Sequence, residues 1–93
     1  MSHSVALSWT ASTDTVDGYN IYRGTAAGGE ATTPVNTGGP VTGTTFTDTS
    51  VTDGDFFYVA RSVKGGVESV NSNEVEAKIV PAPPTSLTVT AAA

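Results

Sequence analysis

Cysteine is absent from this 93-residue chain, which excludes a disulfide framework and a thiolate metal site. Basic residues are scarce, with four lysines and arginines against nine aspartates and glutamates and a formal net charge of −5. Nucleic acids and anionic membranes are bound through clusters of basic side chains, so neither is expected as a partner. No apolar run approaches the roughly 18 residues of a membrane span. The stability of the folded chain must therefore come from a hydrophobic core.

The composition that remains favours a single β-rich domain, and the length of the chain suits one core. Hydrophobic residues make up 38% of the chain and charged residues only 14%. Threonine and serine are abundant, which is typical of strands rather than of long helices. Few lysines, many threonines and an acidic isoelectric point also fit a secreted bacterial surface protein. On this compositional ground we expect an extracellular or cell-surface location.

Alternating apolar and polar residues indicate a series of short strands. The clearest is "VALSW", in which Val5, Leu7 and Trp9 share one face. The sequence "KGG" at 64–66 indicates a hairpin turn. Short strands at spacings near ten residues, with no helix between them, favour an antiparallel β-sandwich. The predicted strands cover residues 5–9, 19–23, 44–48, 56–63 and 75–79, with a short edge strand near 31–36.

The same segments, in this order, resemble the bacterial branch of the fibronectin type III family. The matching pieces are "VALSW" for strand B, "GYNIYRG" for strand C, "TTFTDTSV" for strand E, "DGDFFYVARSV" for the turn into strand F, and "ESVNSNEVEA" for the approach to strand G. Together they cover residues 5–77. The resemblance implies an all-β, immunoglobulin-like antiparallel sandwich of seven strands in two sheets. It also implies a core that contains Trp9, Tyr19, Ile21, Phe46, Tyr58 and Val75.

The chain departs from the family pattern in two places. The position that often holds a corner tyrosine is Phe56 or Phe57, so the usual hydroxyl is missing and packing alone is expected to hold that corner. Strand A, which should precede "VALSW", is not found there. Instead "PPTSLTVTAAA" at 83–93 has the alternation of such a strand, with Leu87 and Val89 on one face. The pattern is that of a fibronectin type III domain whose strand A is encoded at the C-terminus.

A sandwich without strand A leaves strand B at a sheet edge with unpaired backbone groups, which is a template for another strand. We expect residues 1–79 to form strands B to G, 80–86 a proline-rich linker and 87–93 a donor tail. The family fold requires the tail to span roughly 30 to 35 Å to its own strand B, whereas the linker stretches to about 23 Å. The predicted partner is therefore another copy of the chain. The predicted strand-donation interface consists of Leu87, Val89, Ala91, Val5, Leu7 and Trp9.

Three outcomes are open for the tail. Head-to-tail donation that does not close makes a filament, which we favour, whereas two antiparallel chains would close as a swapped dimer. Alternatively the tail is frayed and is the first strand of a following domain. The chain would then be an ordinary spacer or binding module of a secreted bacterial multidomain enzyme or adhesin, with an unidentified carbohydrate or protein ligand.

Several carboxylates invite a metal-binding interpretation. Asp48, Asp53 and Asp55 carry oxygen atoms suited to calcium, but the twelve-residue pattern of a calcium loop is absent. A turn that needs Asp and Gly for backbone reasons explains these residues better, and the same holds for Asp14 and Asp17. We therefore predict no metal site and no cofactor.

Other residue types give little support for catalysis. His3 is the only histidine, and its place beside the start methionine favours a surface role. Tyr22 and Phe57 should face outward, either as a cross-strand pair or as a platform for a sugar or another protein. We predict no catalytic residues and no enzyme activity.

Overall fold

The computed structural model describes residues 3–81, 83–84 and 87–91. Within these residues the chain forms six β-strands and no helix, so the fold is all-β. Two antiparallel sheets are present, one of two strands and one of four, consistent with a β-sandwich. Six strands are found where the resemblance implied seven. Their bounds are β1 His3–Ser8, β2 Gly18–Gly24, β3 Thr45–Val51, β4 Gly54–Lys64, β5 Val67–Glu68 and β6 Val75–Ile79.

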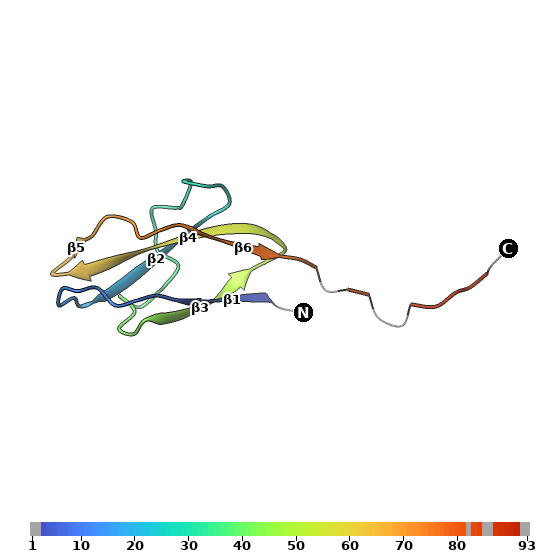
Figure 1. The fold of residues 1–93 in the computed structure, drawn as a ribbon, viewed down its shortest axis with the longest axis horizontal. Helices are drawn as coiled ribbons and strands as arrows, with labels where there is room; N and C mark the ends of the chain where they lie inside the picture. Colours follow the sequence, from blue (N-terminus) through green and yellow to red (C-terminus); the bar gives the residue numbers. More distant parts are fainter. Residues whose placement is uncertain (1–2, 82, 85–86, 92–93) are drawn as a thin grey trace.

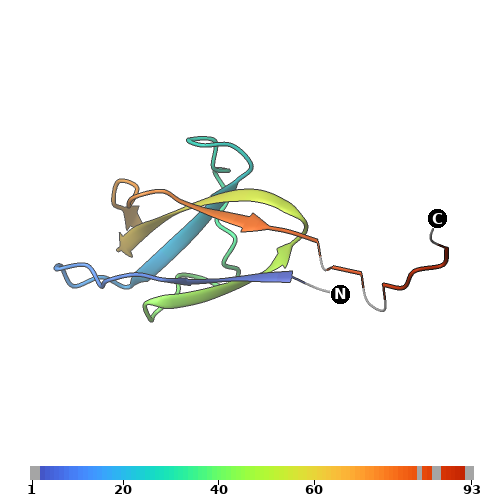
Figure 2. The ribbon, with the colours of Figure 1, turned by 45° about the vertical axis from the view of Figure 1, so that its right-hand side comes forward.

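The two sheets form two layers (Figure 1, Figure 2). β1 pairs with β3 in one layer, and Leu7 lies opposite Phe46. β4 is the centre of the other layer, because it pairs with β2, β5 and β6. All five strands predicted with defined bounds are present, with ends that differ by a few residues. No helix among the described residues is long and apolar enough to cross a membrane.

The hairpin predicted at 64–66 is confirmed. Lys64 pairs with Val67 across a two-residue turn. Both turn residues, Gly65 and Gly66, have positive φ angles of 58° and 80°. Two positive φ values are the geometry of a type I′ turn, which matches the twist of the flanking strands and which glycine adopts without steric cost.

The edge strand expected near 31–36 is not a regular strand. This segment lies along β2, where the Ala31 amide donates to the Arg23 carbonyl and the Val35 amide donates to the Ile21 carbonyl. The Asn36 side chain also accepts a 2.8 Å hydrogen bond from the Ile21 amide. A buried asparagine side chain thus takes one place in the ladder, which explains why the pairing is irregular.

The predicted core is confirmed in part. Tyr19, Ile21 and Tyr58 are buried, and Ile21 and Tyr58 are each only 1% exposed. Trp9 and Phe46 are half-buried. The prediction for Val75 is wrong, because this residue is 43% exposed. It lies at the side of the sandwich where no described strand covers the gap between β1 and β6.

The sandwich has two ends, which we call the tail pole and the far pole. At the tail pole Gly54 pairs with Ile79, and His3 lies 2.8 Å from Asp53. β1 therefore begins where β6 ends. Beyond Ile79 the chain continues away from the sandwich (Figure 1), and the long axis of the molecule reaches 69 Å against 23 and 21 Å for the others. At the far pole are the end of β1, the start of β2 and the β4–β5 hairpin.

Candidate functional site

β1 has one paired edge and one open edge. Within the described residues it pairs only with β3, so its second row of backbone N–H and C=O groups has no strand beside it. Along β1 half-buried and exposed residues alternate strictly, with Val5 and Leu7 on the inward face and Trp9 continuing it after the strand. Residues that face a closed core are usually buried, so half-burial indicates that this side of the core is partly open.

A groove follows the open edge. Its narrow part has a volume of about 80 Å³ and is apolar at its floor, where Leu7, Ile21 and Tyr58 meet Val75. Its wide part, of about 420 Å³, is lined by Trp9, Tyr19, Val70 and several serines. Both parts share walls, so they form one continuous depression, which we call the edge groove. The shared walls are Ser8, Trp9, Ala60, Ser72 and Asn73.

Trp9 is the central side chain of the edge groove. Its ring packs edge-on against Tyr19, with centroids 5.4 Å apart and an interplanar angle of 65°. Its Nε1 atom is buried, yet among the described residues it has no hydrogen-bond partner. The Tyr19 hydroxyl, by contrast, accepts a 2.8 Å hydrogen bond from the Ser12 amide. Buried indole N–H groups usually have an acceptor, so Trp9, a wall residue of the edge groove, carries one unused donor.

The predicted interface divides into two groups that lie apart. Val5 and Leu7 lie on the inward face of β1 and Trp9 follows the strand; Leu7 and Trp9 line the edge groove, whereas Val5 does not. Leu87 and Val89 lie in the extended tail, 91% and 83% exposed, with Ala91 also exposed. Within one chain the tail does not occupy the groove (Figure 1). The structure thus contains a groove beside an open strand edge and, elsewhere, an exposed segment with the alternation of a strand.

The sequence did not reveal the opposite wall of the groove. Ser72 and Asn73 precede β6 and Val75 is its first residue; the sequence predicted this segment as an ordinary connection and strand. The one available signal was a pair of apolar residues, Val70 and Val75, in an otherwise polar stretch. Both are exposed in the structure.

Asp48 is not available as a calcium ligand. It is 2% exposed and accepts hydrogen bonds from Arg23 Nη1 at 2.7 Å and from the Tyr58 hydroxyl at 2.8 Å. The amide and the hydroxyl of Ser50 also donate hydrogen bonds to this carboxylate. Burial acts to raise the pKa of Asp48, but the hydrogen bonds from Tyr58, Ser50 and Arg23 outweigh it and hold that pKa below its usual value. The carboxylate is a structural anion between the two sheets.

The other aspartates are engaged separately. Asp53 pairs with His3, Asp55 lies 3.6 Å from Lys78, and Asp17 accepts a 2.8 Å hydrogen bond from the Gly65 amide. No cluster of three or more potential metal ligands occurs among the described residues. His3 has a local partner, which agrees with the surface role expected for it.

Tyr22 lies on the face of its sheet opposite the core residue Ile21, as expected, but it is buried there and is not an open platform. The guanidinium of Arg61 lies over its ring, 4.9 Å from the centroid, so one ring face is covered. Its hydroxyl donates to Glu68, which also pairs with Arg61 at 3.2 Å. Hydrogen bonds from Asn20 and then from Tyr22 lower the pKa of Glu68. This group ties β2, β4 and β5 together. Phe57 is half-buried.

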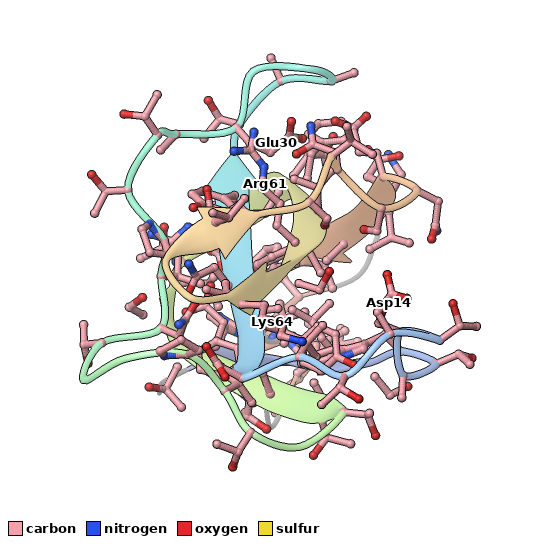
Figure 3. All side chains as sticks on the ribbon, turned by 90° about the vertical axis from the view of Figure 1, so that its left-hand side faces the viewer. Asp14, Glu30, Arg61 and Lys64 are labelled. Carbon is pink, nitrogen blue, oxygen red and sulfur yellow. The ribbon has the colours of Figure 1, made fainter. Side chains whose placement is uncertain are left out.

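Two further hollows lie outside the edge groove. Glu30 and Arg61 line one of about 200 Å³, and Asp14 and Lys64 line another of about 330 Å³ (Figure 3). At the first, a hydrogen bond with the Glu74 carboxylate raises the pKa of Glu30. At the first hollow the Arg61 guanidinium already pairs with Glu68 at 3.2 Å. Neither hollow lies beside the open edge of β1.

Comparisons with known proteins give no assignment: no protein-family model matches the chain, and no curated protein matches it.

Proposed function

We propose that this chain is a non-catalytic structural module that assembles head-to-tail by donating residues 87–91 to the edge groove of another copy. Repetition of this step makes a filament or fibre. The observation that carries the proposal is the open edge of β1 above an apolar groove, in a chain that also holds an exposed, strand-like segment. An extended peptide that joins a sheet edge gains main-chain hydrogen bonds, and its alternate side chains fill pockets.

The side chains of the tail suit this role. Leu87 and Val89 are two residues apart, so in an extended strand both point to the same face. Burying them in the edge groove contributes about 1.5 to 3 kcal/mol each, in addition to the new ladder bonds. Thr88 and Thr90 would then face outward with Ser4, Ala6 and Ser8 of β1, all of which are exposed.

The direct test is the mass of the purified chain by light scattering over a concentration series, with negative-stain microscopy of the same samples. We expect the mass to grow with concentration and fibres to be visible. Leu87→Asp and Val89→Asp should each remain monomeric because they place a charge in the groove. Thr88→Asp is the matched control, since it adds the same charge on the other face of the strand and should still assemble. Assembly of the Leu87 and Val89 variants would refute strand donation.

A second candidate function is that of a spacer or binding module in a secreted bacterial multidomain protein. The observation in its favour is the direction of the tail, which leaves along the long axis as an inter-domain linker would (Figure 2). A monomeric mass at every concentration would select this function. An extracellular or cell-surface location, proposed from composition, fits both functions.

A further inference from the structure

The edge groove has a direction, because its two ends differ. The narrow apolar part lies beside Leu7 and Val75. The wide part lies beyond it at the far pole, where Trp9, Ser12 and Tyr19 line an opening about five times as large, 420 against 80 Å³. An incoming strand with a bulky proline linker behind it fits the wide end better than the narrow end.

The unused donor belongs to a residue of the groove wall. Trp9 Nε1 is buried without a partner among residues 3–81, 83–84 and 87–91, and Trp9 lines both parts of the groove. An inserted strand presents a backbone carbonyl at every residue. Such an acceptor would satisfy the indole N–H.

Building on the proposed function, we infer how the strand docks. Residues 87–91 of a second copy enter the groove at the far pole and run antiparallel to β1 toward the tail pole. The Trp9 indole N–H donates a hydrogen bond to the inserted strand. In this orientation Thr88 lies closer to the C-terminal end of β1, and Thr90 lies closer to its N-terminal end.

This polarity fixes the symmetry of the assembly. Each tail leaves its own sandwich at the tail pole, where Ile79 ends β6 near His3. Antiparallel docking requires it to enter the next sandwich at the opposite pole, so successive copies point the same way and the chain of copies stays open. Parallel docking would require the tail to enter at the tail pole, which closes either a two-fold dimer or a folded-back monomer.

Reach alone does not exclude the chain's own groove. The six residues of β1 cover about 20 Å, less than the expected span, and the linker 80–86 stretches to about 23 Å. However, a tail docked antiparallel in its own groove must first run back along the whole of β1 and then reverse direction. A reversal takes about four residues, and the extended linker has none left for it. A neighbouring copy is thus the partner that antiparallel docking selects.

Cysteine cross-linking measures the polarity, since the chain contains no cysteine of its own. Donor chains carry Thr88→Cys or Thr90→Cys. Acceptor chains carry Ser4→Cys, Ala6→Cys or Ser8→Cys, together with Leu87→Asp and Val89→Asp so that they cannot donate. The mixed disulfide is quantified by mass spectrometry for each of the six pairs. Single-cysteine chains alone provide the background.

Antiparallel docking predicts that the β1 position linked best by the Thr88→Cys donor lies two residues after the position linked best by the Thr90→Cys donor. The reverse order would show parallel docking and overturn the inference while leaving strand donation intact. Absence of cross-links above background at all six pairs, together with a monomeric wild-type chain, would instead refute the proposed function itself.

The hydrogen bond from Trp9 is tested separately with a synthetic peptide of residues 80–93 and the full-length Leu87→Asp, Val89→Asp chain. Trp9 is the sole tryptophan, so its emission reports insertion directly, and we expect a shift to shorter wavelength on peptide binding. The Trp9→Phe variant keeps a packed aromatic ring but loses the N–H group. Because this variant has no tryptophan emission, its binding is measured through a fluorescent label on the peptide. The substitution should weaken peptide binding by about tenfold. Unchanged affinity in the Phe variant would rule out the indole hydrogen bond.

Discussion

The hydroxyl of Tyr58 on β4 donates a 2.8 Å hydrogen bond to the buried carboxylate of Asp48 on β3, and this bond joins the two sheets. Tyr58 also lies directly opposite Arg23 in the β2–β4 pair, and Arg23 donates to the same carboxylate. The charge of Asp48 thus has a cation and several donors around it. A hydroxyl, and not packing alone, therefore holds the part of the fold next to Phe56 and Phe57.

Removing that hydroxyl should destabilise the sandwich without changing its shape. Tyr58→Phe leaves a buried carboxylate with one donor fewer, which costs about 1 to 3 kcal/mol in the free energy of unfolding. Urea denaturation with a spectroscopic probe measures it. Tyr19→Phe is the matched control, because the Tyr19 hydroxyl accepts only one hydrogen bond, from a partly exposed amide, and its loss should cost less. An equal loss in both variants would contradict a special role for Tyr58.

The same pair predicts the pH range of stability. The folded-state pKa of Asp48 lies below its unfolded value near ~3.9, so its stabilisation is complete above that pH and is lost as the pH falls through the folded pKa. Burial and then the hydrogen bond to Asp48 raise the pKa of Tyr58 above its unfolded value near ~10. That stabilisation is complete below pH ~10 and is lost as the pH rises further.

Urea midpoints measured from pH 2 to pH 12 test this range. In the Tyr58→Phe chain the loss of stability between pH ~10 and 12 should be smaller than in the wild type. The loss of stability at acid pH, which depends on Asp48, should remain. If both chains lose stability equally at alkaline pH, the ionisation of a group other than Tyr58 causes the loss.

Glu30 and Glu74 form a pair of like charges whose effect on stability depends on protonation. The hydrogen bond with Glu74 raises the pKa of Glu30, and this contribution to stability is lost as the pH rises through the folded pKa of Glu30. The same bond lowers the pKa of Glu74, and that contribution is lost as the pH falls through the folded pKa of Glu74, so the bond stabilises the fold most between the two values. Glu30→Gln supplies an amide N–H that can donate to Glu74 at any pH. At pH 7 it should raise the melting temperature by about 2 °C.

The control for this substitution is Asp14→Asn, which removes the same charge at an exposed loop position. It corrects for the general benefit of reducing a net charge of −5. A gain in Glu30→Gln no larger than that in Asp14→Asn would show that the carboxyl pair has no specific effect.

Strand positions could be predicted from the sequence because each strand carries its own local pattern. "VALSW" alternates, "KGG" has the φ freedom that its turn uses, and β2 and β4 are rich in aromatic and β-branched residues. The partners of buried polar groups could not be predicted in this way. Asp48 and Arg23 are far apart in sequence, and nothing local distinguishes a buried aspartate that binds an arginine from an aspartate that shapes a turn.

The same limit applies to the candidate site. The sequence places Leu7 and Trp9 on one face, and the structure agrees. It could not place Val75, because exposure there depends on whether another strand covers the gap beside β6. Nor could it show that Trp9 Nε1 lacks a hydrogen-bond partner within the described part of the chain, since that depends on the segment 69–73 across the groove.

Moving residues 83–93 to a position before Met1 should convert the assembling chain into a monomer. The moved strand then precedes β1 through a short connection and can form an antiparallel hairpin with it, at an effective concentration of about millimolar or more. The groove is filled within the chain, so the peptide of residues 80–93 should no longer bind. Light scattering and peptide titration measure both effects. Adding Leu87→Asp to the rearranged chain should weaken the hairpin and restore peptide binding, whereas a rearranged chain that still polymerises would require a different interface between copies.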